Sequence, residues 1–197
     1  MRHGETVWNS EHRFTTHSDV PLSEAGAAQA HAAAAALATT AIDRIWCSPL
    51  QRARVTAETI AAAQSSRPPV SVDERLTEIS AGPFDGHTEE ELAASPMAEA
   101  FAAWHTDGEP RFPEGTESFD SALTRASAFL DQRGGEPGTT LVVTHGSLAR
   151  LMVSSWLLGG PPPLHRHLWL DNCRLAVIEW RGAVPKMVGF NVLAVDA

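Results

Sequence analysis

Three short segments of the sequence place histidine or arginine side chains where strand-like residues give way to a helix. They are Arg2-His3-Gly4-Glu5-Thr6, Ser48-Pro49-Leu50-Gln51-Arg52-Ala53 and Val143-Thr144-His145-Gly146-Ser147. Because α/β folds gather ligands at the carboxyl ends of their strands, we expect these segments to meet there. Two imidazoles, two guanidiniums and helix amino termini in one place suit a phosphate dianion.

The role of that phosphate follows from two motifs that the sequence lacks. It has neither the GxxxxGK[ST] loop of nucleotide-binding proteins nor the GxGxxG fingerprint of dinucleotide-binding folds. The phosphate therefore belongs to a substrate and not to a bound nucleotide cofactor. Hydrolysis or transfer of a phosphate group fits these residues better than redox chemistry does.

Alternating helical and strand-like segments surround these motifs. The patterns predict helices over 23–37, 50–63, 118–133, from 88 toward 104 and from 147, and strands over 42–46, 70–72, 140–144, 174–180 and 184–192. Thr88 and Glu91 have the spacing of a capping box, which marks a helix start. This order predicts an α/β fold, a three-layer α/β/α sandwich. Its sheet is mostly parallel, with an antiparallel C-terminal edge.

Composition limits the classes of protein that the chain can represent. Its 197 residues suffice for one domain, 1–197, with a small helical lid inserted over about 88–115. A net charge of −9 argues against nucleic-acid partners and anionic membrane surfaces. Two cysteines, Cys47 and Cys173, make a disulfide scaffold or a four-ligand zinc site a poor fit. Without a leader or a long apolar run, we expect a soluble cytoplasmic protein.

In these motifs and their order the sequence resembles the histidine phosphatase superfamily, which includes the cofactor-dependent phosphoglycerate mutases. The resemblance covers nearly the whole chain. Beyond the three segments above, it rests on Trp8-Asn9, Arg13, Asp19-Val20-Pro21-Leu22-Ser23, Leu76-Thr77-Glu78, Gly82, Phe84-Asp85-Gly86, Pro113-Glu114-Gly115 and Glu117-Ser118. Each motif is weak alone, but the set in this order is highly specific.

The resemblance implies roles for particular residues. His3 would be the nucleophile that forms a phosphohistidine, and Glu78 the acid that protonates the leaving alkoxide and later activates water. The phosphate pocket would consist of Arg2, Asn9, Arg52 and His145, with the Thr15 hydroxyl on the substrate. No metal and no cofactor are implied, and the expected partner is a small phosphorylated metabolite. As a doubly protonated donor, His145 would lose effect as pH rises.

Two reactions share the phosphohistidine, and they differ in the group that accepts the phosphate. The family's mutases hold a phosphoglycerate with additional basic residues and a longer lid. Here Ile79-Ser80-Ala81 follows Glu78, and no arginine or lysine occurs from Glu89 to Asp107. Water is therefore the expected acceptor, which makes the protein a metal-independent phosphomonoester hydrolase. A phosphoglycerate-mutase-type phosphotransferase is the alternative, because the segment from Arg2 to Phe14 suits both reactions.

The sequence departs from the family pattern in two places. Relatives begin with a buried aliphatic strand directly before the Arg-His-Gly motif, where this sequence has only Met1. Losing about four buried aliphatic residues would cost roughly 6–12 kcal/mol, so we expect that the start has been assigned too late. If it has not, a loose His3 would leave a catalytically weak phosphate-ester binder. The second departure is Thr16-His17, where relatives carry glycine and an aromatic residue.

Other readings of single residues stay open at this stage. Glu78 has acidic neighbours and could be an ordinary surface carboxylate, and His145 could be a buried core histidine. His17 is either a substrate contact or a solvated loop residue. His165 and His167 have strand spacing for a metal, but no third ligand is evident. Neither the substrate nor the oligomeric state can be read from the sequence.

Overall fold

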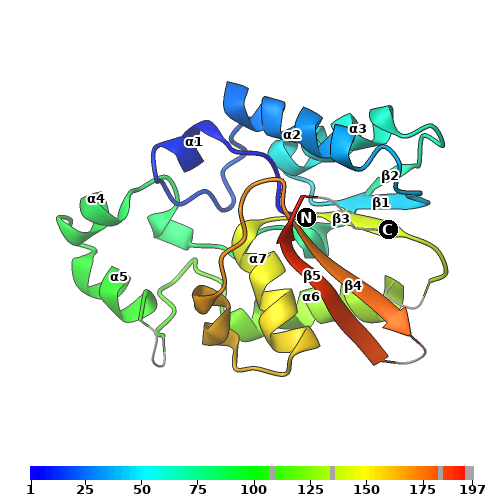
Figure 1. Cartoon of the computed structure of the whole chain (residues 1–197). Coiled ribbons are helices and arrows are strands. Elements are labelled where there is room, and N and C mark those ends of the chain that lie inside the picture. Colours follow the sequence, from blue (N-terminus) through cyan, green and yellow to red (C-terminus); the bar gives the residue numbers. More distant parts are fainter. Residues whose placement is uncertain (107–109, 134–135, 182–183, 194–197) are drawn as a thin grey trace.

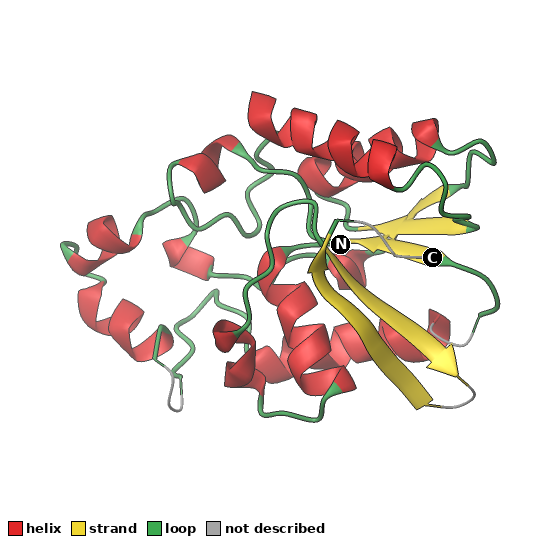
Figure 2. Ribbon diagram, viewed as in Figure 1, coloured by secondary structure: helices red, strands yellow, loops and turns green. Residues whose placement is uncertain are grey.

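A three-stranded parallel sheet separates two layers of helices (Figures 1 and 2). The computed structural model describes residues 1–106, 110–133, 136–181 and 184–193. The strands β1 (Arg44–Cys47), β2 (Val70–Val72) and β3 (Thr140–Val143) have the order β2-β1-β3. Helices α2 (Glu24–Ala36) and α3 (Gln51–Ala63) cover one face, and α6 (Phe119–Arg133) and α7 (Gly146–Leu151) cover the other. The predicted α/β architecture is confirmed.

The central strands β1 and β3 carry apolar side chains on both faces, one face fully buried and the other partly buried. Ile45 and Val143 face the core beneath α2 and α3, whereas Trp46 and Val142 pack against the core beneath α6 and α7. Strands of this kind lack the polar alternation of a half-exposed sheet. The carboxyl ends of β1 and β3 therefore lie side by side, with Cys47 paired to Val143.

Side-chain caps start several of the helices where the sequence places them. The Ser23 hydroxyl accepts the Gly26 amide at the start of α2, and Thr88 and Glu91 form the predicted capping box of α4 (Glu89–Ala93). A second capping box, between Thr6 and Asn9, starts the short helix α1 (Val7–Ser10). The remaining short elements are η1 (Glu74–Leu76), η2 (Gly82–Phe84), the π-helix η3 (Met152–Leu157) that continues α7, and η4 (Pro162–His167).

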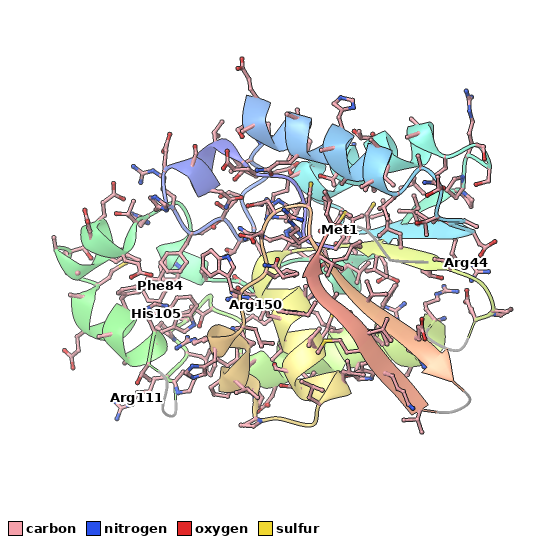
Figure 3. The ribbon with its side chains drawn as sticks, in the orientation of Figure 1. Met1, Arg44, Phe84, His105, Arg111 and Arg150 are labelled. Atoms are coloured by element: carbon pink, nitrogen blue, oxygen red, sulfur yellow. The ribbon has the colours of Figure 1, made fainter. Side chains whose placement is uncertain are left out.

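Helices α4 and α5 (Ala98–Trp104) stand to one side of the sandwich and form the small helical insertion (Figure 1). An aromatic cluster joins them to the body: the Phe84 and Trp104 rings are 5.1 Å apart, and the Phe14 and Trp104 rings are 5.6 Å apart. Figure 3 shows Phe84 and His105 on this side of the molecule. The first turn of α4 carries three glutamates, so the insertion is acidic.

The C-terminal strands β4 (Leu175–Arg181) and β5 (Val184–Val192) pair antiparallel, as predicted. Among the described strands they form a separate two-stranded sheet, and no β3–β4 ladder joins them to the parallel sheet. The segment Met1–His3 lies between the two sheets. Arg2 forms a parallel bridge with Thr144, and its amide donates to the Arg174 carbonyl at 3.1 Å. No helix in the described part of the chain is long and apolar enough to span a bilayer.

Two glycines bring the start of α2 against the loop that follows His3. A methyl group on Gly26 would overlap the Glu5 carbonyl, and one on Gly4 would lie 2.5 Å from the Gly26 carbonyl oxygen. Each glycine thus permits a backbone approach that a side chain would block. The Ser23 amide fixes the same contact by donating to the Glu5 carbonyl at 2.9 Å.

Replacing Gly26 with alanine should therefore destabilise the fold, even though alanine favours helices. We expect a loss of at least about 2 kcal/mol, because the Glu5 backbone must move. For a protein of this size the melting temperature should fall by about 4 °C or more. The control is Ala27→Ser, which adds one heavy atom at the neighbouring exposed position. Equal melting temperatures for the two variants would show that the close approach is not required.

Candidate active site

His3 lies in a buried position with one ring nitrogen already committed. Its side chain is 3% exposed, and Nδ1 lies 2.6 Å from the Gly4 carbonyl oxygen. A carbonyl can only accept, so Nδ1 carries the proton and Nε2 keeps its lone pair. Burial, and next the Arg52 and Arg2 guanidiniums, hold the pKa of His3 well below the ordinary histidine range. The neutral ring thus keeps a free lone pair on Nε2, which is what a nucleophile requires.

Arg52 and His145 meet beside His3, and neither is exposed. Arg52, at the start of α3, donates to the Ser18 carbonyl at 2.8 Å and to the Thr16 carbonyl at 2.6 Å. Its Nε donates to His145 Nδ1 at 3.3 Å. The His3 and His145 rings are 5.1 Å apart and arranged edge to face. The three predicted segments therefore meet, because the His145 ring contacts both Arg52 and His3.

The protonation of His145 differs from the sequence-based expectation. Because Nδ1 accepts from Arg52, the ring proton sits on Nε2 and faces the Ser48 hydroxyl at 2.8 Å. Burial first, and then the nearby His3 and Arg52, keep the pKa of His145 well below its usual value. In the free site His145 is a neutral donor. The expectation of a doubly protonated His145 was wrong because desolvation and adjacent cations disfavour the charged ring, and a sequence pattern does not show either effect.

Arg2, which is partly buried, contributes a second guanidinium to this site. It donates through one terminal nitrogen to the Leu170 carbonyl at 2.8 Å, while its Nε is buried without a hydrogen-bond partner among the described residues. That Nε packs against Gly146, where a Cβ would lie 3.3 Å away. Burial lowers the pKa of both Arg2 and Arg52 from its ordinary high value. A buried N–H donor of this kind is costly until an acceptor reaches it.

The Glu78 carboxylate lies against the start of α7. One oxygen accepts the Ile79 and Leu148 amides at 2.9 Å, and the other accepts the Ser147 amide at 3.0 Å. The side chain is 6% exposed, so Glu78 is not an ordinary surface glutamate. Its charge acts on Arg2, Arg52 and Arg150. The glutamate that the motif singled out is thus part of the same buried cluster.

Of the remaining predicted residues, Asn9 lies in α1 and Thr15 lies in the loop around Arg52. The Asn9 amide nitrogen donates to the Thr15 hydroxyl at 3.4 Å, and the Thr15 carbonyl accepts from Arg52, also at 3.4 Å. Asn9 also caps α1, accepting from the Thr6 amide at 3.1 Å. His17 places Nε2 3.0 Å from the Glu78 carbonyl oxygen. Its imidazole therefore contacts the site through the backbone of Glu78.

One arginine that sequence reasoning missed fixes the backbone of Glu78. Arg125 of α6 forms a bidentate pair with Glu117, with distances of 2.7 and 2.8 Å. The same guanidinium donates to the Arg75 carbonyl at 2.7 Å and to the Glu78 carbonyl at 3.3 Å. This cation thus holds both ends of the turn that presents Glu78. In the sequence, only the separation of eight residues between Glu117 and Arg125 could have indicated this pair, and that indication is weak.

Arg150 is the second missed arginine (Figure 3). It lies one helical turn after Gly146 and donates back to the Gly146 carbonyl at 3.0 Å, and to the Ser147 hydroxyl at 3.2 Å. A further bond reaches the Leu168 carbonyl at 3.0 Å. Its position four residues after Gly146 is the pattern that could have identified it.

The described residues contain no group of three or more His, Cys, Asp or Glu side chains placed to hold a metal ion. His165 is buried and directs Nδ1 to the Pro162 carbonyl at 2.7 Å. Its ring packs edge to face on Phe119, with centroids 4.7 Å apart. His165 is thus a core residue with a backbone partner. The site instead offers a buried imidazole with an unprotonated nitrogen, two guanidiniums, a neutral imidazole donor and a carboxylate, which together suit phosphoryl transfer.

Comparison with known proteins gives a consistent result. The family model described as "Histidine phosphatase superfamily (branch 1)" matches residues 1–193. A protein of Yersinia enterocolitica named "Probable phosphoglycerate mutase GpmB" is 35% identical over 188 residues, which are 92% of this chain and 83% of that protein.

Solved structures agree in fold. The alpha-ribazole phosphatase from Shigella flexneri superposes with a TM-score of 0.89 at 25% identity, covering 100% of this chain and 96% of that one. A variant of phosphoserine phosphatase from Entamoeba histolytica, in complex with phosphoserine, gives a TM-score of 0.81 at 28% identity. That match covers 98% of this chain and 94% of the other.

The buried basic groups predict that stability falls as pH is lowered. Burial lowers the pKa of the Met1 amino group from 8.0 to about 5 and that of His165 from 6.5 to about 4. At a pH between the ordinary pKa of each group and its lowered pKa in the folded protein, the unfolded chain takes up a proton that the folded chain does not. His3 and His145 act in the same direction below pH 6.5.

The stabilisation is thus complete above pH 8 and declines toward pH 5. We expect the melting temperature to fall by about 10 °C across this range, as measured by calorimetry at constant ionic strength. His165→Gln should make this decline shallower, whereas His31→Gln, on the exposed side of α2, should not change it. A melting temperature that stays constant from pH 8 to pH 5 would contradict the burial of these groups.

Proposed function

Because the chain belongs to the histidine phosphatase superfamily, we propose that it is a metal-independent phosphomonoester hydrolase that acts through phosphorylated His3. Its catalytic residues are His3, Glu78 and His145, and its phosphate ligands are Arg2, Asn9 and Arg52. The Thr15 hydroxyl binds the remainder of the substrate. The whole chain acts as one domain, with the lid over about 88–115.

One observation carries this proposal: the bond from His3 Nδ1 to the Gly4 carbonyl, 2.6 Å long, leaves Nε2 unprotonated within a cluster of buried cations. A nucleophile must be unprotonated at the attacking atom, and its target must be made electrophilic. Arg2 and Arg52 supply the charge that draws electrons from a bound phosphate. The Nδ1 contact also fixes the plane of the ring, so Nε2 keeps one direction of attack.

In the first step, His3 Nε2 attacks phosphorus and the bond from phosphorus to the ester oxygen breaks. Glu78, which takes up a proton when the phosphate ester binds beside it, gives that proton to the departing alkoxide, which leaves as an alcohol. The guanidiniums of Arg2 and Arg52 stabilise the charge on the equatorial oxygens, and the Nε2 proton of His145 joins them when it turns from the Ser48 hydroxyl to the phosphate. Asn9 adds an amide donor at the edge of the same pocket.

In the second step, water attacks the phosphorus of the phosphohistidine. The Glu78 carboxylate takes a proton from that water, the bond between phosphorus and nitrogen breaks, and inorganic phosphate leaves. The enzyme returns to neutral His3, and Glu78 passes this proton to solvent to become again the carboxylate of the free site, so all protons are accounted for. The clamp of Arg125 and His17 on the Glu78 carbonyl keeps this carboxylate in one place through both steps.

The lid supports water as the acceptor. Helices α4 and α5 contain no lysine or arginine, and α4 begins with three glutamates. A second anionic ligand, such as the carboxylate of a phosphoglycerate, finds no cation on these helices. The substrate class is a small phosphorylated metabolite. The Entamoeba neighbour holds one such compound, phosphoserine.

A second candidate function is a phosphoglycerate-mutase-type phosphotransfer. It is favoured by the identity of 35% with the Yersinia protein named as a mutase. A mutase returns the phosphate from the enzyme to a second hydroxyl instead of releasing it to water. The two functions share every step up to the phosphohistidine, so they are separated by the product.

Trapping of the phosphoenzyme tests the nucleophile. The protein is mixed with a ³²P-labelled aryl phosphate and quenched in alkali, in which phosphohistidine survives. We expect label on the protein, loss of the label in His3→Ala, and turnover reduced by about a thousandfold or more. His31→Ala, an exposed histidine of α2, serves as the matched control and should label normally. Label that persists in His3→Ala would assign the nucleophile elsewhere.

The Glu78→Gln variant separates the two steps. An aryl phosphate leaves without protonation, so this variant should still form the phosphoenzyme, while its hydrolysis slows by about 10²–10⁴-fold. The measurement is single-turnover decay of the label, and the expected result is accumulation above the wild-type level. If decay proceeds at the wild-type rate, Glu78 does not activate the water. If no label forms in any variant and no phosphate is released, the protein is a phosphate-ester binder.

The product distinguishes the phosphatase from the mutase. With 3-phosphoglycerate and catalytic amounts of 2,3-bisphosphoglycerate, we expect release of inorganic phosphate to exceed isomerisation to 2-phosphoglycerate at least tenfold. Phosphorus NMR follows both products in one sample. Isomerisation that exceeds phosphate release would establish the mutase reaction instead.

A further inference from the structure

The His3 ring takes its direction from a backbone carbonyl, and that carbonyl belongs to a glycine. His3 Nδ1 lies 2.6 Å from the Gly4 carbonyl oxygen, which is part of the peptide unit that joins Gly4 to Glu5. A methyl group on Gly4 would overlap the Gly26 carbonyl, so no side chain restricts rotation at this position. The direction of the His3 ring is therefore only as well defined as the plane of this one peptide unit.

A glutamine of α2, the helix that lies against this part of the chain (Figure 1), holds the same peptide unit at its other polar group. The Glu5 N–H donates to Gln29 Oε1 at 2.9 Å. An N–H can only donate, so the oxygen of the Gln29 amide, and not its nitrogen, faces Glu5. The bond between Gly4 and Glu5 is trans, which makes its carbonyl and its N–H point in opposite directions within one plane. A side chain that fixes the N–H therefore also fixes the carbonyl to which His3 donates.

The preceding peptide unit, which joins His3 to Gly4, is held by three groups. Its N–H donates to Thr56 Oγ1 of α3 at 3.1 Å. Its carbonyl accepts from Asn172 Nδ2 at 3.0 Å and from the Cys173 amide at 3.3 Å. Loss of one of these groups leaves the other two in place.

The peptide unit after Gly4 has no such redundancy. In the part of the chain that the structure describes, Gln29 is the one acceptor of the Glu5 N–H, and the Gly4 carbonyl bonds to the His3 ring that it orients. If Gln29 lost its acceptor oxygen, this unit could turn and the carbonyl would leave Nδ1. The ring proton would then be shared between Nδ1 and Nε2, because the partner of one ring nitrogen decides which of the two carries it.

We infer that Gln29 is a positioning residue for the His3 imidazole. Through the peptide unit between Gly4 and Glu5, it keeps the ring proton on Nδ1 and the lone pair of Nε2 in one direction. Gln29 acts through the backbone and not by contact with the reacting atoms. The consequence for catalysis rests on the proposed function, in which this lone pair attacks phosphorus, whereas the position of the proton can be measured without any reaction.

Nitrogen-15 NMR of the histidine side chains reads the position of the proton. The protein is labelled in its histidines and studied at mildly alkaline pH, and the His3 ring is assigned from the signals that are lost in His3→Gln. We expect protonated Nδ1 and unprotonated Nε2 in the wild type, and a mixture of the two tautomers in Gln29→Leu. The matched control is Gln29→Glu, which keeps an oxygen acceptor for the Glu5 N–H and should keep the wild-type signals. Asn172→Leu should change them less than Gln29→Leu, because the Cys173 amide still holds the His3 carbonyl.

Single-turnover phosphorylation measures the effect of this positioning on the reaction. With a labelled aryl phosphate, Gln29→Leu should form the phosphoenzyme about ten- to a hundredfold more slowly than the wild type and Gln29→Glu, because a misdirected lone pair attacks less often. Inhibition by inorganic phosphate should change by less than about twofold, since Arg2 and Arg52 are unaltered. A purely structural role would lower the melting temperature and leave the tautomer as it is.

The two measurements separate the positioning of His3 from the proposed function. The wild-type tautomer in Gln29→Leu would overturn the inference, and so would a mixed tautomer with an unchanged rate of phosphorylation. A wild type that forms no phosphoenzyme, but loses its tautomer in Gln29→Leu, would contradict the proposed function and support the control of the ring by Gln29. Should Gln29→Leu fail to fold, Gln29→Met removes the same acceptor with an unbranched side chain.

Discussion

The guanidinium of Arg52 has no exposed surface, and much of the molecule is arranged around that charge. A buried cation requires hydrogen-bond acceptors on every side, and here the carbonyls of the loop from Thr15 to Ser18 supply them. His145 completes the set by offering a ring nitrogen, which forces it to remain neutral. The loop, the carboxyl end of β3 and the start of α3 thus have to meet at one point.

Two guanidiniums in this cluster face a single carboxylate, Glu78, whose oxygens are already bonded to three backbone amides. The cluster therefore carries an excess of positive charge away from water. Such a charge is unfavourable in the empty protein and becomes favourable when an anion enters. The Nε of Arg2 is an example at a single atom, because this N–H donor is buried and has no acceptor among the described residues. The free site is organised for a ligand with more charge than any of its own side chains carries.

The sequence was sufficient to predict that the residues after β1 and after β3 lie together, because the order and direction of the strands determine where their ends lie. Strands β1 and β3 are parallel neighbours, so the residues after Cys47 and after Val143 had to lie together. It did not predict the protonation of His145 or the clamp of Arg125 on Glu78. Both depend on side chains that approach from elements far apart in the chain. The separation of the hairpin from β3 was also missed, since apolar runs do not report which strand edges pair.

The acidic insertion has a consequence for how a ligand arrives. The protein carries a net charge of −9, and α4 adds its glutamates beside the body of the molecule, while Arg52 of the site is buried. A phosphate ester would therefore approach against the average field of the protein and feel attraction only at short range. Added salt screens that repulsion over about 10 Å or less. Encounter with a dianion should thus become faster as ionic strength rises, which is the reverse of electrostatic steering by an exposed basic patch.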